Sequence, residues 1–276
     1  MKQLIVILIA AFSLCLGAAG KTKTVAKPAF AHPWTGKRVA YIGDSVSDPN
    51  LKQGEDMKHY WDYLAEWLDI TPIVYAVSGH TLMNGFANLE RLHNEHGDSV
   101  DAVVVFLGTN DFNMSLPLGT TYIEEDAEVE RAAGYPKRKD YTRRRTPALT
   151  DKTICGRINL VMQRMKTLYP TRQLVFLTPL HRGYAKFGEN NVQPDESYSN
   201  LQGNYIGDVA QAIVEAGRVW SVPVVDLYAL CGLLPNLPAH DIYIFNPARD
   251  RLHPNELGHE RIAKTIMQQT LTLPVY

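Results

Sequence analysis

The chain alternates short apolar runs with longer segments whose apolar residues recur at helical spacing. The runs are rich in Val and Ile and are typical of buried strands in a parallel sheet. They lie at 38–42, 73–77, 102–107, 173–177 and 222–227. The helical segments lie at 60–68, 83–96, 156–169, 201–217 and 255–271. In the last of them, Leu257, Ile262 and Ile266 are expected to face inward. Repeats of strand then helix predict an α/β fold, with helices on both faces of a five-stranded parallel sheet.

A serine follows the first apolar run directly, in Gly43-Asp44-Ser45. A strand that ends in a glycine-containing turn can present a hydroxyl at the carboxyl edge of a sheet, where open α/β sheets bind ligands. Far downstream, Asp250 precedes His253 by three residues. On a turn, such an Asp can accept the ring Nδ1–H, which leaves Nε2 free to take a serine proton. The chain therefore carries the groups of a Ser-His-Asp triad.

Two further strand ends carry N–H donors. Asn110, in Gly108-Thr109-Asn110-Asp111, follows the third run and has an amide NH₂ group, and Ser78-Gly79 follows the second run. An ester hydrolase needs such donors beside its nucleophile to stabilise an oxyanion. Because parallel strands end at a common edge, these groups are expected to converge.

Four blocks of sequence now stand in order: Gly43-Asp44-Ser45, Gly79, Gly108-Thr109-Asn110-Asp111 and Asp250-x-x-His253-Pro254. They resemble the blocks of the SGNH (GDSL-type) hydrolase family, over nearly the whole mature chain. The resemblance implies a three-layer α/β/α sandwich of flavodoxin-like type. It implies Ser45 as nucleophile, His253 as general base and Asp250 as orienting acid. It also implies an oxyanion hole built from the backbone N–H groups of Ser45 and Gly79 and the side chain of Asn110.

Three other residues near predicted strand ends are candidates for the site. His80 follows Gly79, and Arg182 follows the fourth strand; either can bind substrate or lie on the rim. Asp226 ends the fifth strand and is a rival for the triad acid. Its expected role is to accept hydrogen bonds from nearby backbone N–H groups.

The N-terminus reads as a secretory signal peptide over residues 1–20, with a basic start, an apolar stretch and small residues before the cleavage site. The apolar stretch is short for a membrane span, although an uncleaved anchor is the alternative. An approach segment at 21–36 and one hydrolase domain at 37–276 follow. We therefore expect a secreted or periplasmic protein, with association with the cell surface left open.

Residues 112–153 are the least regular part of the domain and carry an acidic patch followed by a basic one. A loop of this length is usually functional or disordered. Two interpretations stand. Because the segment follows Asn110, it can overhang the cleft and select substrate; otherwise it is a solvated loop whose charges compensate each other.

A net charge of −1 gives no field that would recruit nucleic acid. The His, Cys, Asp and Glu residues show no metal-ligand spacing, and no nucleotide-binding glycine motif is present, so no cofactor is expected. Cys155 and Cys231 flank apolar segments, which favours buried free thiols over a disulfide. The expected partner is a small-molecule or glycan ester, and the oligomeric state is open.

These observations predict an exported serine esterase that acts through an acyl-enzyme. By analogy with exported family members, the expected substrate is a small acyl group, acetyl first, on a carbohydrate. A lysophospholipase, lipase or thioesterase would use the same chemistry, as would an acyl transferase acting on sugars. A non-catalytic glycan-binding module is disfavoured because every residue that the chemistry needs is present.

Overall fold

The structure is a computed structural model that describes residues 32–51, 57–127 and 143–274. The predicted signal peptide and most of the approach segment lie outside the described residues. The described residues belong to one compact unit.

The centre of the fold is a five-stranded parallel sheet with strand order β2-β1-β3-β6-β9. The strands are β1 (Arg38–Gly43), β2 (Thr71–Ala76), β3 (Ala102–Phe106), β6 (Gln173–Leu177) and β9 (Val224–Val225). Gly43, the last residue of β1, lies opposite Ala76 of β2 and Phe106 of β3. Because the three strands end level, the segments that follow them meet at one edge of the sheet, which we call the carboxyl edge.

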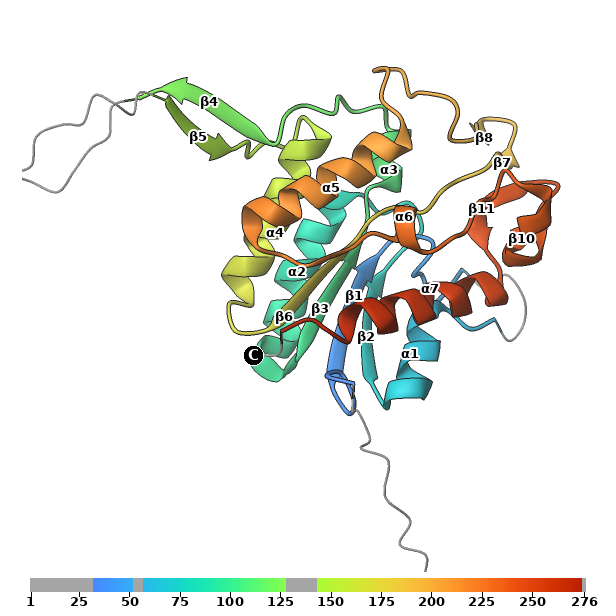
Figure 1. The fold of residues 1–276 in the computed structure, drawn as a ribbon, viewed down its shortest axis with the longest axis horizontal. Helices are drawn as coiled ribbons and strands as arrows, with labels where there is room; N and C mark the ends of the chain where they lie inside the picture. The colour runs from blue at the N-terminus through green and yellow to red at the C-terminus, as the bar shows by residue number, and fades with distance from the viewer. Residues whose placement is uncertain (1–31, 52–56, 128–142, 275–276) are drawn as a thin grey trace, which may run out of the picture. The chain divides into compact units, whose positions relative to one another are not determined.

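Helices cover both faces of this sheet (Figure 1). One face packs against α2 (Leu82–His96), α4 (Ile154–Leu168) and α5 (Ile206–Trp220); the other packs against α1 (Tyr60–Leu68) and α7 (Glu256–Thr270). Alternate residues of β3 point to opposite faces, since Val103 and Val105 join the first core and Val104 the second. This two-residue alternation produces the three-layer α/β/α architecture that the sequence predicted.

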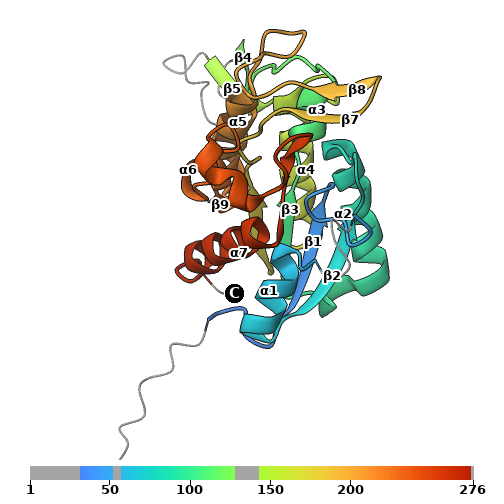
Figure 2. The same ribbon diagram turned by 90° about the vertical axis from the view of Figure 1, so that its right-hand side faces the viewer.

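A second, four-stranded sheet lies beyond the carboxyl edge, with strand order β10-β11-β7-β8 (Figure 2). Its strands are β7 (Ala185–Gly188), β8 (Asn191–Gln193), β10 (Ile244–Asn246) and β11 (Asp250–Pro254). Short helices connect these parts: η1 (Gly97–Ser99), α3 (Thr109–Asn113), α6 (Leu227–Leu230) and η2 (Pro238–Tyr243). The sequence did not predict this sheet, and it carries the Asp250–His253 block on a strand, where the sequence predicted a turn.

The described parts of the 112–153 segment, residues 112–127 and 143–153, are more regular than predicted. Strands β4 (Tyr122–Asp126) and β5 (Arg143–Pro147) pair in an antiparallel ribbon. The acidic and basic patches face each other across it, with Glu124 opposite Arg145 and Glu125 opposite Arg144. Opposite charges facing each other across neighbouring strands add a small stabilisation to this backbone pairing.

Two smaller predictions were also wrong. Strand β9 has only two residues, because Asp226 caps α6, which begins at Leu227. Leu257, expected to face the core from α7, is exposed, whereas Ile262 and Ile266 on the same helix are buried. Leu257 precedes Ile262 by five residues, which places it about 140° around the helix.

Candidate active site

The nucleophile candidate stands on a tight turn at the end of β1. A Cβ atom on Gly43 would lie 2.4 Å from Ser47 Oγ, so the close approach of the turn requires glycine there. Ser47 is held in turn by a hydrogen bond of 2.9 Å between its hydroxyl and the buried Tyr60 hydroxyl. Ser45 therefore starts from a fixed backbone at the carboxyl edge.

Ser45, His253 and Asp250 form a hydrogen-bonded chain. Ser45 Oγ lies 2.9 Å from His253 Nε2, and His253 Nδ1 lies 2.8 Å from Asp250 Oδ2. With the ring proton assigned to Nδ1, the imidazole donates to Asp250 and accepts from the serine hydroxyl. Asp250 and His253 are both buried, so water competes little for these bonds.

Strand β11 explains how Asp250 turns back toward His253. Its second oxygen, Oδ1, accepts hydrogen bonds from the backbone N–H groups of Leu252 and His253, both at 3.1 Å. The carboxylate is therefore oriented by its own strand while Oδ2 faces the ring. Asp226, the rival acid, instead accepts from the Ala229 N–H and the Thr178 hydroxyl as a helix cap.

The candidate oxyanion donors come from the ends of β2 and β3. Gly79 has a φ of 85°, a conformation that favours glycine and is part of the turn after β2. The amide nitrogen of Asn110 donates to the His80 carbonyl at 2.9 Å and lies 3.4 Å from Asp44 Oδ2. Ser45, Gly79 and Asn110 all line one cavity together with His253.

Asp48 connects these two turns, although in the sequence it stands out only as part of an Asp-Pro pair. One carboxylate oxygen accepts from both the N–H and the hydroxyl of Ser78, each at 2.8 Å. Burial raises the pKa of Asp48, but hydrogen bonds from Asn50 and Ser78 outweigh it and hold the pKa below its ordinary value. As a carboxylate, Asp48 fixes the turn of Gly79 against the turn of Ser45.

Asp44 is buried like Asp48, but its carboxylate accepts fewer hydrogen bonds, from the Val46 N–H and, at 3.4 Å, from the Asn110 amide. Burial raises its pKa to about 7, although the Val46 N–H and the nearby His253 act in the opposite direction. Asp44 is therefore a group beside the site that titrates near neutral pH.

Two cavities meet at Ser45. The larger, of about 250 Å³, is lined by Gly79, Asn110 and His253 and by residues of the β7–β8 hairpin. The smaller, of about 20 Å³, also reaches Ser45 and Asn110. Its apolar lining comes from Val46, Phe106, Leu180 and Leu252. His253 lines the larger cavity and not the smaller one. The larger cavity is therefore where the imidazole ring can reach the oxygen of a leaving group.

His80 and Arg182, the two candidates for substrate binding, lie elsewhere than the sequence predicted. His80 contributes its backbone carbonyl to Asn110, and its ring lies 3.4 Å from the Asn88 amide; neither cavity at Ser45 is lined by it. Arg182, expected to bind substrate or to lie on the rim, is buried and donates to Asn113 and Gln193 at 2.6 and 2.7 Å. Its neighbour His181 lines the smaller cavity instead.

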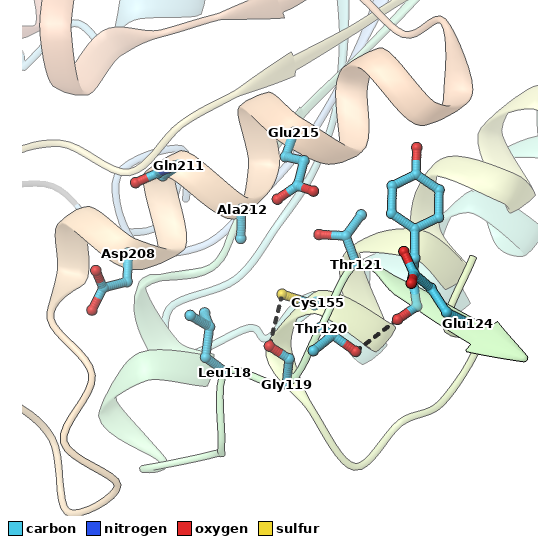
Figure 3. A pocket seen from close by; sticks show the side chains of 11 residues that line it. Leu118, Gly119, Thr120, Thr121, Glu124, Cys155, Asp208, Gln211, Ala212 and Glu215 are labelled. Atoms are coloured by element: carbon cyan, nitrogen blue, oxygen red, sulfur yellow. Dashed lines mark hydrogen bonds between the residues drawn. The ribbon is translucent and has the colours of Figure 1, made fainter. Parts of the chain in front are cut away.

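A cavity of about 590 Å³, larger than the two at Ser45, lies away from Ser45, between residues 118–124 and α5 (Figure 3). Asp208, Gln211 and Glu215 of α5 line it, and Cys155 of α4 lies at its base. Burial raises the pKa of the Cys155 thiol, which makes it a poor nucleophile. The triad therefore marks the site better than cavity size does.

Cys155 and Cys231 are both buried and free, as the sequence predicted. Within the described ranges, no three His, Cys, Asp or Glu residues are placed to hold a metal ion. None of the helices in that part of the chain is both long and apolar enough to cross a membrane.

A Ser-His-Asp chain at the carboxyl edge of a parallel α/β sheet is the arrangement of a serine hydrolase. The family model for the GDSL-like lipase/acylhydrolase family matches residues 41–261, so the chain belongs to that family and is an ester-hydrolysing enzyme. A comparison with curated proteins gives no match.

Solved structures show the same fold. A protein from Lactobacillus plantarum is 25% identical, with a TM-score of 0.63, over 85% of this chain and 96% of that one. A structure described as a possible lipase from Chitinophaga pinensis DSM 2588 is 20% identical, with a TM-score of 0.58, over 84% and 96%. The acetyl xylan esterase AlAXEase is 17% identical, with a TM-score of 0.53, over 84% and 98%. At the identities of the last two, the likeness concerns the fold alone.

Proposed function

We propose that this protein is an exported serine esterase that removes small acyl groups, acetyl first, from carbohydrate esters. The observation that carries the chemistry is the hydrogen-bonded chain from Ser45 through His253 to Asp250. The observation that supports a short acyl group is the cavity of about 20 Å³ beside Ser45. That volume accommodates little more than one water-sized group, such as the methyl of an acetyl ester.

In the proposed reaction, Ser45 Oγ attacks the ester carbonyl while His253 Nε2 takes the hydroxyl proton. Asp250 stabilises the imidazolium that forms. The carbonyl oxygen becomes an oxyanion, which accepts hydrogen bonds from the N–H groups of Ser45 and Gly79 and from Asn110.

His253 then gives its proton to the leaving alkoxide, which departs as the free alcohol and leaves an acyl group on Ser45. A water molecule attacks this acyl-enzyme, with His253 again as base. The products are a carboxylic acid and the regenerated serine.

The proposed carbohydrate substrate rests on weaker support. AlAXEase shares the fold and is an acetyl xylan esterase, but the likeness carries no substrate to this chain. Export rests on the sequence of residues 1–20, with the basic start and apolar stretch of a signal peptide.

The test is a series of ethyl esters from acetate to octanoate, assayed with the purified chain by titration of the released acid. We expect kcat/KM to be highest for acetate and to fall with each added pair of carbons. Ser45→Ala is the matched control for background hydrolysis. A maximum at octanoate would favour a lipase or thioesterase instead. Acetylated product in place of free acetate, with a sugar acceptor present, would favour an acyl transferase.

A further inference from the structure

The β7–β8 hairpin forms the outer wall of the 250 Å³ cavity at Ser45. Phe187, Asn191 and Gln193 of the hairpin line this cavity together with His253. The Phe187 ring centroid lies 5.5 Å from that of His253, and the side chain is 43% exposed. The family motifs do not include the hairpin, so its residues have no role in the chemistry described so far.

A β-bulge directs Phe187 toward the cavity. Lys186 pairs with Val192 and Gly188 pairs with Asn191, so Phe187 is one residue in excess on β7. Bulges of this kind change the direction of a side chain and are common beside active sites.

The hairpin is held firmly on the strand that carries the triad acid. Ala185 of β7 lies opposite Asp250 of β11. The Lys186 N–H donates to the Arg249 carbonyl at 2.7 Å, and the Arg251 N–H donates to the Tyr184 carbonyl at 2.9 Å. Phe187 is therefore placed relative to the triad by backbone hydrogen bonds.

The side-chain amides of Asn191 and Gln193, which line the cavity with Phe187, are oriented by the buried guanidinium of Arg182. Arg182 and Asn113 both donate to Gln193 Oε1, at 2.7 and 3.1 Å, and the Gln193 amide donates to Asn191 Oδ1 at 3.2 Å. These hydrogen bonds fix the direction of the two amide side chains, Asn191 and Gln193, in the wall of the cavity. Since α3 carries both Asn110 and Asn113, the same contacts tie the hairpin to the candidate oxyanion donor.

The chemistry of this wall suits a neutral ring with an apolar face and polar edges. The negative face of an aromatic ring attracts the C–H groups of a sugar ring, while amides donate to and accept from its hydroxyl groups. Among the described residues that line the cavity, none is Lys, Arg, Asp or Glu. A phosphate headgroup would therefore find no cation among these described lining residues.

We infer that the β7–β8 hairpin is the leaving-group subsite, where Phe187 stacks on the pyranose ring of an acetylated sugar and Asn191 and Gln193 bind its hydroxyl groups. This inference rests on the proposed esterase function, because the cavity receives the alcohol that His253 protonates.

The experiment compares two acetate esters that share the acyl group and differ in the alcohol: a per-acetylated methyl xyloside and ethyl acetate. For Phe187→Ala, we expect the ratio of kcat/KM for the sugar ester to that for ethyl acetate to fall about tenfold, chiefly through KM. Phe187→Trp should keep the ratio at or above that of the unchanged protein. The matched control is Phe245→Ala, since Phe245 is 41% exposed on β10 of the same sheet and lines neither cavity.

The outcomes separate the two proposals. If the unchanged protein does not hydrolyse ethyl acetate or the sugar ester, the esterase function fails. If it does hydrolyse them and Phe187→Ala leaves the ratio as it was, the subsite is wrong and the esterase function stands. If Phe187→Ala changes the acyl-length profile of the ethyl esters instead, Phe187 lines the acyl side and the inference is also wrong.

Discussion

The β4–β5 ribbon and the carboxyl edge of the central sheet both gather carboxylates, but in different surroundings. In the ribbon, Glu124 accepts from Arg145 Nε at 2.8 Å, and both side chains are exposed. At the carboxyl edge, Asp250 binds His253 at the same distance, but the pair is buried, and Asp44 nearby is buried as well. An exposed ion pair is screened by water and salt and contributes little to the free energy of unfolding. A buried carboxylate is shielded from water, so its hydrogen bonds are stronger and hold it in a fixed direction. Two ionic contacts of the same length can therefore differ in strength, and burial is what distinguishes them.

The largest effect is expected at the nucleophile. Ser45→Ala should lower kcat by on the order of 10³ or more. The protein should stay folded, because the change removes one hydroxyl from a partly exposed turn. Ester hydrolysis and thermal unfolding of the same preparation would measure both. Turnover near that of the unchanged protein would remove Ser45 as the nucleophile.

The next effect compares two aspartates with different roles. Asp250→Asn should lower kcat on the order of 10³, because an amide presents the wrong hydrogen-bonding pattern to Nδ1 and favours the wrong tautomer of His253. Asp226→Asn is the control: Asp226 caps α6, so its loss should act on stability, by up to about 1 kcal/mol. Steady-state kinetics of both variants would measure the change in kcat, and urea unfolding would measure the change in stability. The reverse pattern would mean that the acid lies at Asp226.

Asn110→Ala tests charge stabilisation in the transition state. We expect kcat to fall by about 10² to 10³ with KM little changed, since the amide binds the oxyanion more strongly than the ground-state carbonyl. Asn204→Ala, which removes an amide that donates to the Leu116 carbonyl, is the matched control. Asp111 is a poor control because it is buried and paired with Arg157. A defect confined to KM would withdraw the oxyanion role.

The raised pKa of Asp44 leads us to expect that the stability of the protein depends on pH. Its pKa in the folded protein is about 7, above the ordinary value of about 4 for Asp. Between these values the folded state holds a proton that the unfolded state has released, so this group should make stability fall as pH rises from about 4 to about 7 and level off above. Asp44→Asn should flatten that decline, as urea unfolding across this range would show. An unchanged slope would contradict the assignment.

The smallest effect is expected in the ribbon. Glu124→Gln weakens an exposed ion pair and should change the free energy of unfolding by no more than about 0.5 kcal/mol. Esterase kcat/KM should stay the same within error, since the described residues of the ribbon line neither cavity at Ser45. A marked rise in KM would show that the ribbon takes part in substrate selection, as one interpretation of residues 112–153 held.

The sequence predicted the central sheet and the residues that the site brings together because both depend on local signals. Val103, Val104 and Val105 read as a buried strand whatever surrounds them. Ser45 and Asn110 follow such strands directly, and parallel pairing brings strand ends together without further information. The Asp250–His253 spacing is local as well, although the structure places it on a strand.

The rest could not be read from the sequence because it depends on distant partners. Strand β8 has three residues, and β7 becomes a strand by pairing with β11 about 65 residues away, a choice that tertiary contacts decide. Phe187 therefore carried no signal. Arg182 was expected to bind substrate or to lie on the rim. Its burial is made tolerable by the amide oxygens of Asn113 and Gln193 and by the nearby charges of Glu196 and Asp195.

The hydrogen bond between Ser45 and His253 joins residues 208 positions apart in the chain. Contacts of such separation close the longest loops and are slow to form, whereas the pairing of β1 with β2 spans about 30 residues. A partly folded chain can thus hold much of its core before it holds a working triad. On the proposed mechanism, the protein acquires its chemistry only when strand β11 has docked, so we expect a chain that has not finished folding to be inert toward esters.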